Sequence, residues 1–227
     1  MNKIIINVFM IALMAAAISS SYAFDNKVTH RDITKTAVLS SQASLDQILI
    51  DRLGFKNGIG TVINYTGIDS TKGTPFIPYS LKIIDLLREG SYDEDVPNCR
   101  ASNHFHNPLK PWNQSGMSDA PNWLHIWCSA WVPWYSNIVW ATGETPNTWD
   151  WRHTRNAYFL ALTSLSEQDR NNYYAATFWG LGHELHLLQD VAVPAHVRND
   201  FTGHWAIPNT ILPYSPEKFE AFVKDRP

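Results

Sequence analysis

Residues 182–204 read Gly-His-Glu-Leu-His-Leu-Leu-Gln-Asp-Val-Ala-Val-Pro-Ala-His-Val-Arg-Asn-Asp-Phe-Thr-Gly-His, a run whose spacing suits metal binding. His186 and Asp190 are four residues apart, so on a helix they share one face. Pro194 tends to end such a helix, which lets the chain turn and bring His196 back toward the same place. Imidazole and carboxylate groups are ligands that zinc takes. The run therefore predicts a zinc site at the end of a helix, with further ligands supplied from elsewhere in the chain.

Helical patterns extend over most of the sequence. Ser166, with Asp169 three residues on, forms a capping box that predicts the start of a long helix running to Asp190. Residues 54–75 contain five glycines and residues 91–122 are polar, so both segments are predicted to be loops. We find no alternating strand pattern of useful length, and the fold class expected is all-α. The other predicted helices are 29–40 with Thr29 as N-cap, 44–53, 78–89 ended by Gly90, 151–165 and 215–225.

The first 23 residues have the features of an export signal. Lys3 is the only charged residue before Asp25, an apolar run follows it, and Ser21-Tyr-Ala23 is a small-x-small cleavage site. We expect cleavage after Ala23, a secreted or periplasmic protein, and a single mature domain over residues 24–227. The sequence ends soon after the last predicted helix, and a continuation beyond Pro227 stays an open alternative.

Charge and cysteine content restrict the partners and the chemistry. The net charge of −3 becomes −4 when the single lysine of the signal is removed, which argues against a general attraction to nucleic acid but leaves room for a local basic groove. Cys99 and Cys128 are the only cysteines. In an exported protein they can form one disulfide or stay reduced, and both states remain open.

The order and local context of the candidate ligands resemble the zinc-dependent phospholipase C / P-one nuclease superfamily. His186-Leu-Leu-Gln-Asp190 followed by Pro194-Ala-His196 has the family's spacing of His, Asp and a His after a Pro. The resemblance covers essentially the whole mature chain through sparse motifs, and it implies a single multi-helix bundle. The other matching segments are His30 near the mature N-terminus, Gly90-Ser-Tyr-Asp-Glu-Asp95, His104-Phe-His-Asn-Pro108, and Phe219-Glu220-Ala-Phe-Val.

The resemblance implies a layout with up to three zinc ions. One zinc takes Asp95, His104, His186 and a shared Asp190; a second takes His30, Asp190 and the N-terminal amine and carbonyl of Phe24; a third takes His196, His204 and Glu220. The sequence departs from the family at two points. The mature N-terminus is phenylalanine instead of tryptophan, and His204 and Glu220 are sixteen residues apart instead of four. Asp200 and Glu217 are alternatives for the last ligand.

This layout implies hydrolysis of a phosphate ester by water activated at zinc. Asp95 is expected to accept the proton of that water, and Arg198 either orients the phosphate or forms a surface salt bridge. A phospholipid headgroup is the favoured substrate, and a single-stranded nucleic acid is the alternative. A non-catalytic, zinc-stabilised binding module is the alternative from another class. No protein partner is evident.

Tryptophan is abundant in the middle of the chain. Eight of the ten tryptophans lie in residues 112–151, and Trp123, Trp127, Trp131 and Trp134 have helical spacing. Packing in the core or against another subunit is the favoured interpretation. Peripheral contact with a membrane and stacking on bases are the functional alternatives.

Overall fold

The computed structural model describes residues 28–67, 78–117, 128 and 134–200. Within these residues the chain forms seven α-helices and two short strands, so it is mostly helical, as the sequence predicts. The expected signal (1–23), most of the tryptophan stripe and the helix expected at 215–225 lie outside the described residues. None of the described helices combines the length and the apolar character that crossing a membrane demands.

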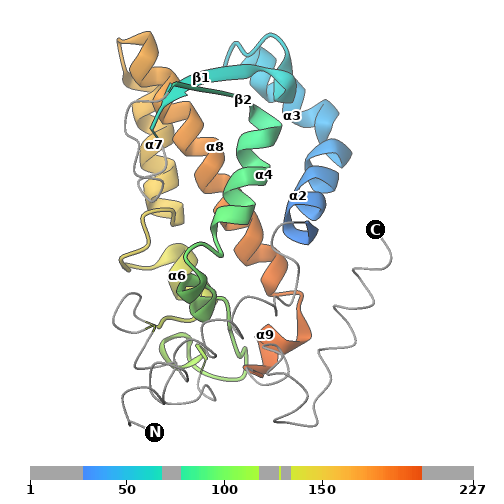
Figure 1. Ribbon diagram of the computed structural model, residues 1–227, viewed down its shortest axis with the longest axis vertical. Coiled ribbons are helices and arrows are strands. Elements are labelled where there is room, and N and C mark those ends of the chain that lie inside the picture. The colour runs from blue at the N-terminus through green and yellow to red at the C-terminus, as the bar shows by residue number, and fades with distance from the viewer. Residues whose placement is uncertain (1–27, 68–77, 118–127, 129–133, 201–227) are drawn as a thin grey trace, which may run out of the picture.

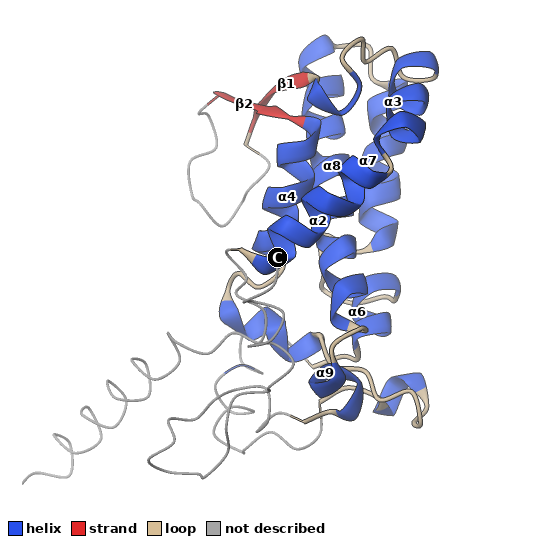
Figure 2. Ribbon diagram, turned by 90° about the vertical axis from the view of Figure 1, so that its right-hand side faces the viewer, coloured by secondary structure: helices blue, strands red, loops and turns tan. Residues whose placement is uncertain are grey.

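The long helix α8 (Glu167–Asp190) is the centre of the arrangement. Helix α4 (Ile83–Asp93) and helix α7 (Trp151–Thr163) both pack along it, and α2 (Thr29–Ser40) packs on α4. Figures 1 and 2 show a two-stranded hairpin across one end of this bundle and the short helix α9 (Pro194–Arg198) at the other. The remaining described helices are α3 (Gln42–Asp51), which continues from α2, and α6 (Asn137–Thr142).

Both ends of α8 follow local sequence signals. The Ser166 side chain accepts a hydrogen bond from the backbone N–H of Asp169, which confirms the predicted N-cap. The helix ends at Asp190, four residues before Pro194, and Pro194 occupies the first turn of α9, where its missing N–H is not needed. Only three residues therefore separate the two helices, which brings His196 back beside the end of α8.

Helices α4 and α8 touch through two glycines. A Cβ on Gly90 would lie 2.0 Å from the backbone oxygen of Trp179, and a Cβ on Gly182 would lie 2.3 Å from the backbone oxygen of Leu87. The prediction that Gly90 ends its helix is wrong, because α4 continues to Asp93. Gly90 is needed for close packing of two backbones, which the local sequence does not distinguish from a helix end.

The hairpin is absent from the sequence-based prediction. Strand β1 (Val62–Thr66) pairs antiparallel with β2 (Pro78–Lys82), and Ile63 lies opposite Leu81. The first five residues of the helix predicted at 78–89 therefore form a strand, and part of the predicted loop at 54–75 forms its partner. Ile63 and Tyr65 alternate with exposed residues and fill the apolar core at this end of the bundle. Five residues give too short an alternation to be recognised without the partner strand.

Other helix boundaries agree with the prediction to within a few residues. Helix α2 covers the predicted range, but Thr29 is its first residue and Val28 is the N-cap, with no side-chain cap. Helix α3 begins and ends two residues earlier than predicted, and α7 ends two residues earlier.

The main core gathers residues from the hairpin, α2, α3, α4 and α8, among them Leu49, Ile63, Leu86, Phe178 and Trp179.

The glycine contact gives a test of the packing. Gly182→Ala should lower the free energy of unfolding by about 1–3 kcal/mol, because the methyl group overlaps the backbone of α4. In a helix, alanine is more stable than glycine by about 1 kcal/mol, so helix propensity alone predicts that Gly182→Ala raises the free energy of unfolding. Urea unfolding measures the change. Gly60→Ala is the matched control, since nothing lies within 4 Å of its added methyl group; equal stability of the two variants would contradict the packing argument.

Candidate metal centre

Three helix ends meet at the end of the bundle opposite the hairpin. The first turn of α2 carries His30, the end of α4 leads to Asp95, and the last turns of α8 carry His186 and Asp190. A 3-10 helix, η4 (Asn98–Asn103), then delivers His104 to the same place. These residues and His196 of α9 are all buried, so six of the predicted ligands lie together in the interior.

One carboxylate oxygen of Asp190 faces a group of possible ligands. Asp190 Oδ2 lies 2.9 Å from His104 Nδ1 and 3.3 Å from His186 Nε2, and these two nitrogens are 3.3 Å apart. Asp95 lies 3.6 Å from His104 Nδ1 and 3.8 Å from His186 Nε2. With zinc–ligand bonds of about 2.0–2.2 Å, the ligand atoms of a tetrahedral site are roughly 3.3–3.6 Å apart. His104, His186 and Asp190 therefore have a spacing that fits one zinc ion, and Asp95 lies close to the same two histidines and groups with His30 and His186.

The other oxygen of Asp190 faces two different histidines. Asp190 Oδ1 lies 3.6 Å from His30 Nε2 and 3.4 Å from His196 Nδ1. Neither oxygen of Asp190 has a partner in hydrogen-bond geometry within the described part of the chain. A buried carboxylate without well-oriented donors is unfavourable unless a cation completes its surroundings. Asp190 is therefore placed to bridge two metal ions, one at each oxygen.

The hydrogen bonds behind the histidines fix which ring nitrogen faces the centre. His186 Nδ1 donates to the backbone oxygen of Ser91 at 2.6 Å, which leaves the Nε2 lone pair directed at the cluster. His30 Nδ1 lies 2.8 Å from Gln189 Oε1. Because Gln189 Nε2 donates to Thr34 Oγ1 at 2.8 Å, the amide oxygen must face His30. Such partners hold the tautomer and orientation that metal binding requires.

Glu94 supports the third histidine from a fully buried position. Its Oε1 lies 3.5 Å from His104 Nε2 and accepts a hydrogen bond of 2.7 Å from Trp140 Nε1. Its Oε2 accepts from Arg100 Nη2 at 2.6 Å and from His183 Nδ1. Glu94 is thus held by three donors from three segments, and its Oε1 faces Nε2 of His104 while Nδ1 of the same ring faces Asp190.

Charge within the cluster is strongly coupled. Burial alone would raise the pKa of Asp190, but His196, His186 and His104 hold it well below its usual range. Burial opposes protonation of His104, yet Asp190 and Glu94 raise its pKa to about 10. Burial, together with the neighbouring His186, lowers the pKa of His30 well below its usual value. Without metal, a proton on His104 balances the buried carboxylates, and a metal ion would replace that proton.

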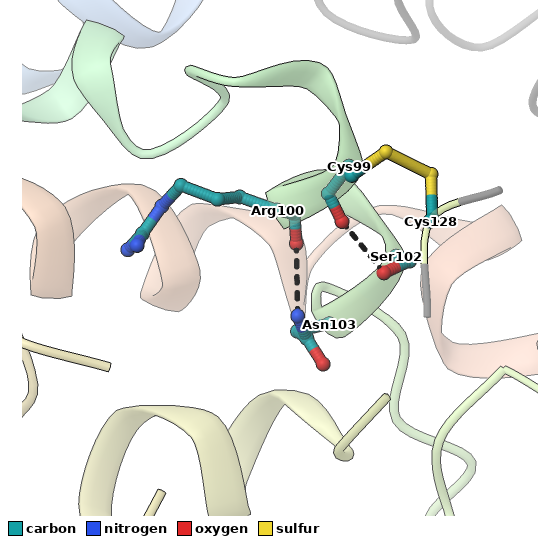
Figure 3. The surroundings of a disulfide bond; sticks show 5 residues. All are labelled: Cys99, Arg100, Ser102, Asn103 and Cys128. Carbon is teal, nitrogen blue, oxygen red and sulfur yellow. Dashed lines mark hydrogen bonds between the residues drawn. A yellow bond between two sulfur atoms is a disulfide. The ribbon is translucent and has the colours of Figure 1, made fainter. Parts of the chain in front are cut away.

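A disulfide anchors the segment between Asp95 and His104. Cys99 and Cys128 are bonded, which settles the question that their number left open. Figure 3 shows the side chains of Cys99 and Arg100 leaving η4 in different directions, with Ser102 Oγ donating to the Cys99 carbonyl at 2.7 Å. One neighbour is therefore tied to residue 128 while the other reaches Glu94. The short segment that carries two predicted ligands is thereby fixed on both sides.

The structure adds two residues, Glu94 and His183, to the six candidate ligands. His183 is buried, donates to Glu94, and stacks on Trp149 with ring centroids 5.2 Å apart. The three-residue step from His183 to His186 is the only sequence signal for this role.

Trp140 is also buried, in agreement with a packing role for the tryptophans, whereas Trp112 and Trp151 are exposed.

Arg198 lies at the surface instead of in the cluster. Its side chain is 58% exposed, and Nη2 lies 3.6 Å from Asp200 Oδ2, which is the surface salt bridge that the sequence analysis kept as an alternative. A role for Arg198 in holding phosphate stays a prediction. Phe24, His204, Glu220 and Glu217 lie outside the described residues. Of the expected third zinc site, the structure describes His196 and the alternative ligand Asp200, whose carboxylate pairs with Arg198.

Comparison of the chain with protein-family models, with curated proteins and with solved structures gave no match.

The Glu94 contacts predict that this residue controls metal affinity through His104, without binding the metal itself. Glu94→Gln should weaken zinc binding about 10–100-fold, because the amide cannot accept from all of its present donors and His104 loses its orientation. Competition with a chromophoric chelator measures the affinity, and the absorption spectrum of bound Co2+ reports distortion of the site. Glu89→Gln on α4 is the control, since it removes only a partly exposed ion pair with Arg31. Wild-type affinity and an unchanged cobalt spectrum in Glu94→Gln would contradict the prediction.

Proposed function

We propose that this chain is an exported, zinc-dependent phosphodiester hydrolase with a helical fold of the phospholipase C / P-one nuclease type. The support is of two kinds. The sequence motifs resemble that superfamily in order and spacing, and the six described candidate ligands from four segments are buried against one another. Phospholipase C-like cleavage of a phospholipid headgroup is the favoured activity, and single-strand nuclease activity is the alternative within the same chemistry.

The observation that carries the proposal is the position of Asp190 between two pairs of histidines. Oδ2 faces His104 and His186, while Oδ1 faces His30 and His196. A carboxylate shared in this way is typical of sites that hold two metal ions about 3.5–4 Å apart, which many phosphatases and nucleases use. A single structural zinc needs only one of these two groups of ligands.

The residues of the chain have distinct tasks in such a site. His104, His186, Asp95 and Asp190 would hold one zinc ion, and His30 and Asp190 would contribute to a second. Bound zinc supplies positive charge that attracts phosphate oxygens and makes a nearby water more acidic. Asp95 is the most exposed of the carboxylates here at 6%, and burial raises its pKa, so it is the carboxylate best placed to accept a proton from that water.

Burial of the cluster favours one competing function. A structural zinc site has all of its ligands from the protein and no position for water, and the described ligands are indeed all buried. A non-catalytic binding module stabilised by zinc is therefore the second candidate. It differs from the hydrolase in metal content and in the effect of Asp95, and both differences can be measured.

Metal content separates the two candidates. The hydrolase should bind more than one zinc ion per chain, and Asp190→Asn should reduce occupancy at both sites because each Asp190 oxygen serves a different site. Inductively coupled plasma mass spectrometry of dialysed protein gives the ratio. Asp85→Asn is the control, because Asp85 lies on α4 in a surface ion pair with Arg88. One tightly held zinc per chain, retained in Asp190→Asn, would rule out the two-metal arrangement.

A substrate panel tests the chemistry. Zinc-loaded protein should release the headgroup of phosphatidylcholine, and chelation of zinc should abolish the reaction. Asp95→Asn should lower kcat about 10²–10⁴-fold with a smaller change in KM, because it removes a proton acceptor. Single-stranded DNA, RNA and a chromogenic phosphodiester complete the panel. Turnover of nucleic acid alone would identify the nuclease, whereas no turnover of any substrate by zinc-loaded protein would support the binding module.

A further inference from the structure

Helix α7 places its bulky apolar side chains on the outside. Trp151, Tyr158, Phe159 and Leu162 are exposed, and their spacing of seven, one and three residues puts them on one side of the helix. Leu165, just beyond the C-cap Ser164, is also apolar and is 97% exposed. We call these five residues the α7 apolar face.

The inner side of α7 carries the small residues. Thr154 and Ala161 are buried, and the hydroxyl of Thr154 lies close to Gly180 of α8. An ordinary surface helix has its large apolar residues inward and its polar residues outward. Leu160 is the one large apolar residue of α7 that is half-buried, so packing on α8 does not explain why the exposed positions include aromatic and aliphatic side chains. Exposed apolar surface of this kind marks a site of interaction.

Charge on α7 indicates what covers this face. The helix contains Arg152 and Arg155 and no acidic residue, although the chain as a whole has a net charge of −3. Both arginines are exposed. Arg152 has one distant ion pair, 3.9 Å from the buried Asp150, and no described carboxylate lies within 4.0 Å of Arg155. The α7 apolar face therefore has two exposed arginines beside it.

Tryptophan, tyrosine, phenylalanine and leucine on one side of a helix, with arginines next to them, are the composition of helices that lie in the surface of a membrane. Tryptophan and tyrosine favour the headgroup level, and arginine pairs with anionic lipid. A nucleic-acid surface fits less well, because Leu162 and Leu165 cannot stack on bases and two arginines neutralise few phosphates.

We propose that α7 docks the protein on an anionic phospholipid surface, with the α7 apolar face inserted among the headgroups and Arg152 and Arg155 bound to lipid phosphate. This inference extends the proposed function, because it identifies the element that would bring a phospholipase to its substrate. It rests on the proposed function only for the purpose of docking. Docking uses none of the metal ligands, so it is measurable apart from hydrolysis.

Co-sedimentation with vesicles tests the proposal. The zinc-loaded protein should bind vesicles of equal parts phosphatidylcholine and phosphatidylglycerol more tightly than vesicles of phosphatidylcholine alone, and salt should weaken the binding. Phe159→Ser/Leu162→Ser should weaken it about tenfold or more. Each of Arg152→Gln and Arg155→Gln should weaken it about fivefold on mixed vesicles, with less effect on neutral vesicles.

Matched controls lie on the opposite side of the bundle and in a loop. Ile48→Ser removes an apolar side chain of similar exposure from α3, Leu109→Ser removes one that is 92% exposed, and Arg52→Gln removes a cation at the end of α3. All three controls should bind vesicles as the wild type does. Circular dichroism and urea unfolding show whether the α7 variants keep their fold, which is expected because the substituted side chains face solvent.

Four outcomes would overturn docking by α7. The first is failure of the wild type to bind mixed vesicles, and the second is an equal loss of vesicle binding in the controls. The third is a dimer in analytical ultracentrifugation that Phe159→Ser/Leu162→Ser dissociates, with no vesicle binding. The fourth is binding of single-stranded DNA that depends on the arginines but not on Phe159. Headgroup release is assayed separately. Vesicle binding without zinc-dependent hydrolysis would contradict the proposed function and support the docking surface. Zinc-dependent hydrolysis without vesicle binding would support the proposed function and contradict docking by α7.

Discussion

The close approach of α4 to α8 is the constraint on which the site depends. Gly90 and Gly182 let the two backbones meet without side chains between them. This contact places the carbonyl of Ser91 at 2.6 Å from His186 Nδ1, so a backbone group of one helix orients a ligand on the other. Packing of this kind tolerates no added volume. The geometry of the candidate metal centre therefore depends on the packing of the bundle.

Burial of so many ionisable groups requires compensation. Asp95 and Asp190 lie beside four imidazoles, and Glu94 just outside them is paired with Arg100. Carboxylates in an apolar interior are strongly unfavourable unless cations or donors surround them. In the metal-free protein, imidazolium and guanidinium groups supply the positive charge. Bound metal ions would supply more positive charge. The same compensation makes each ligand a rigid part of the core, which suits a site that must hold its geometry.

The two ends of the molecule have different roles. The hairpin, α3 and the first half of α8 form most of the apolar core, with Ile63, Leu49 and Phe178 packed together. In the described part of the other end, apolar packing is divided among three small clusters around Phe105, Trp140 and Val193, and hydrogen bonds, ion pairs and the disulfide from Cys99 also hold the chain. Stability and chemistry are thus separated along the axis of the bundle, which allows the ligand end to carry polar groups that a uniform core could not accept.

The sequence by itself determined the mostly helical class, the N-cap of α8 at Ser166 and the shared face of His186 and Asp190, because these depend on residues within a few positions of one another. It also marked His196, through its place after Pro194, and His30, Asp95 and His104, through resemblance to a family, as candidate ligands. Only the tertiary structure decided the hairpin, the packing role of Gly90, and the positions of Glu94 and His183 behind His104. Each of these depends on a partner far away in the chain: β1 needs β2, Gly90 needs Trp179, and Glu94 needs Arg100, Trp140 and His183. Spacing along the sequence cannot reveal such a partner, because folding alone brings the two together.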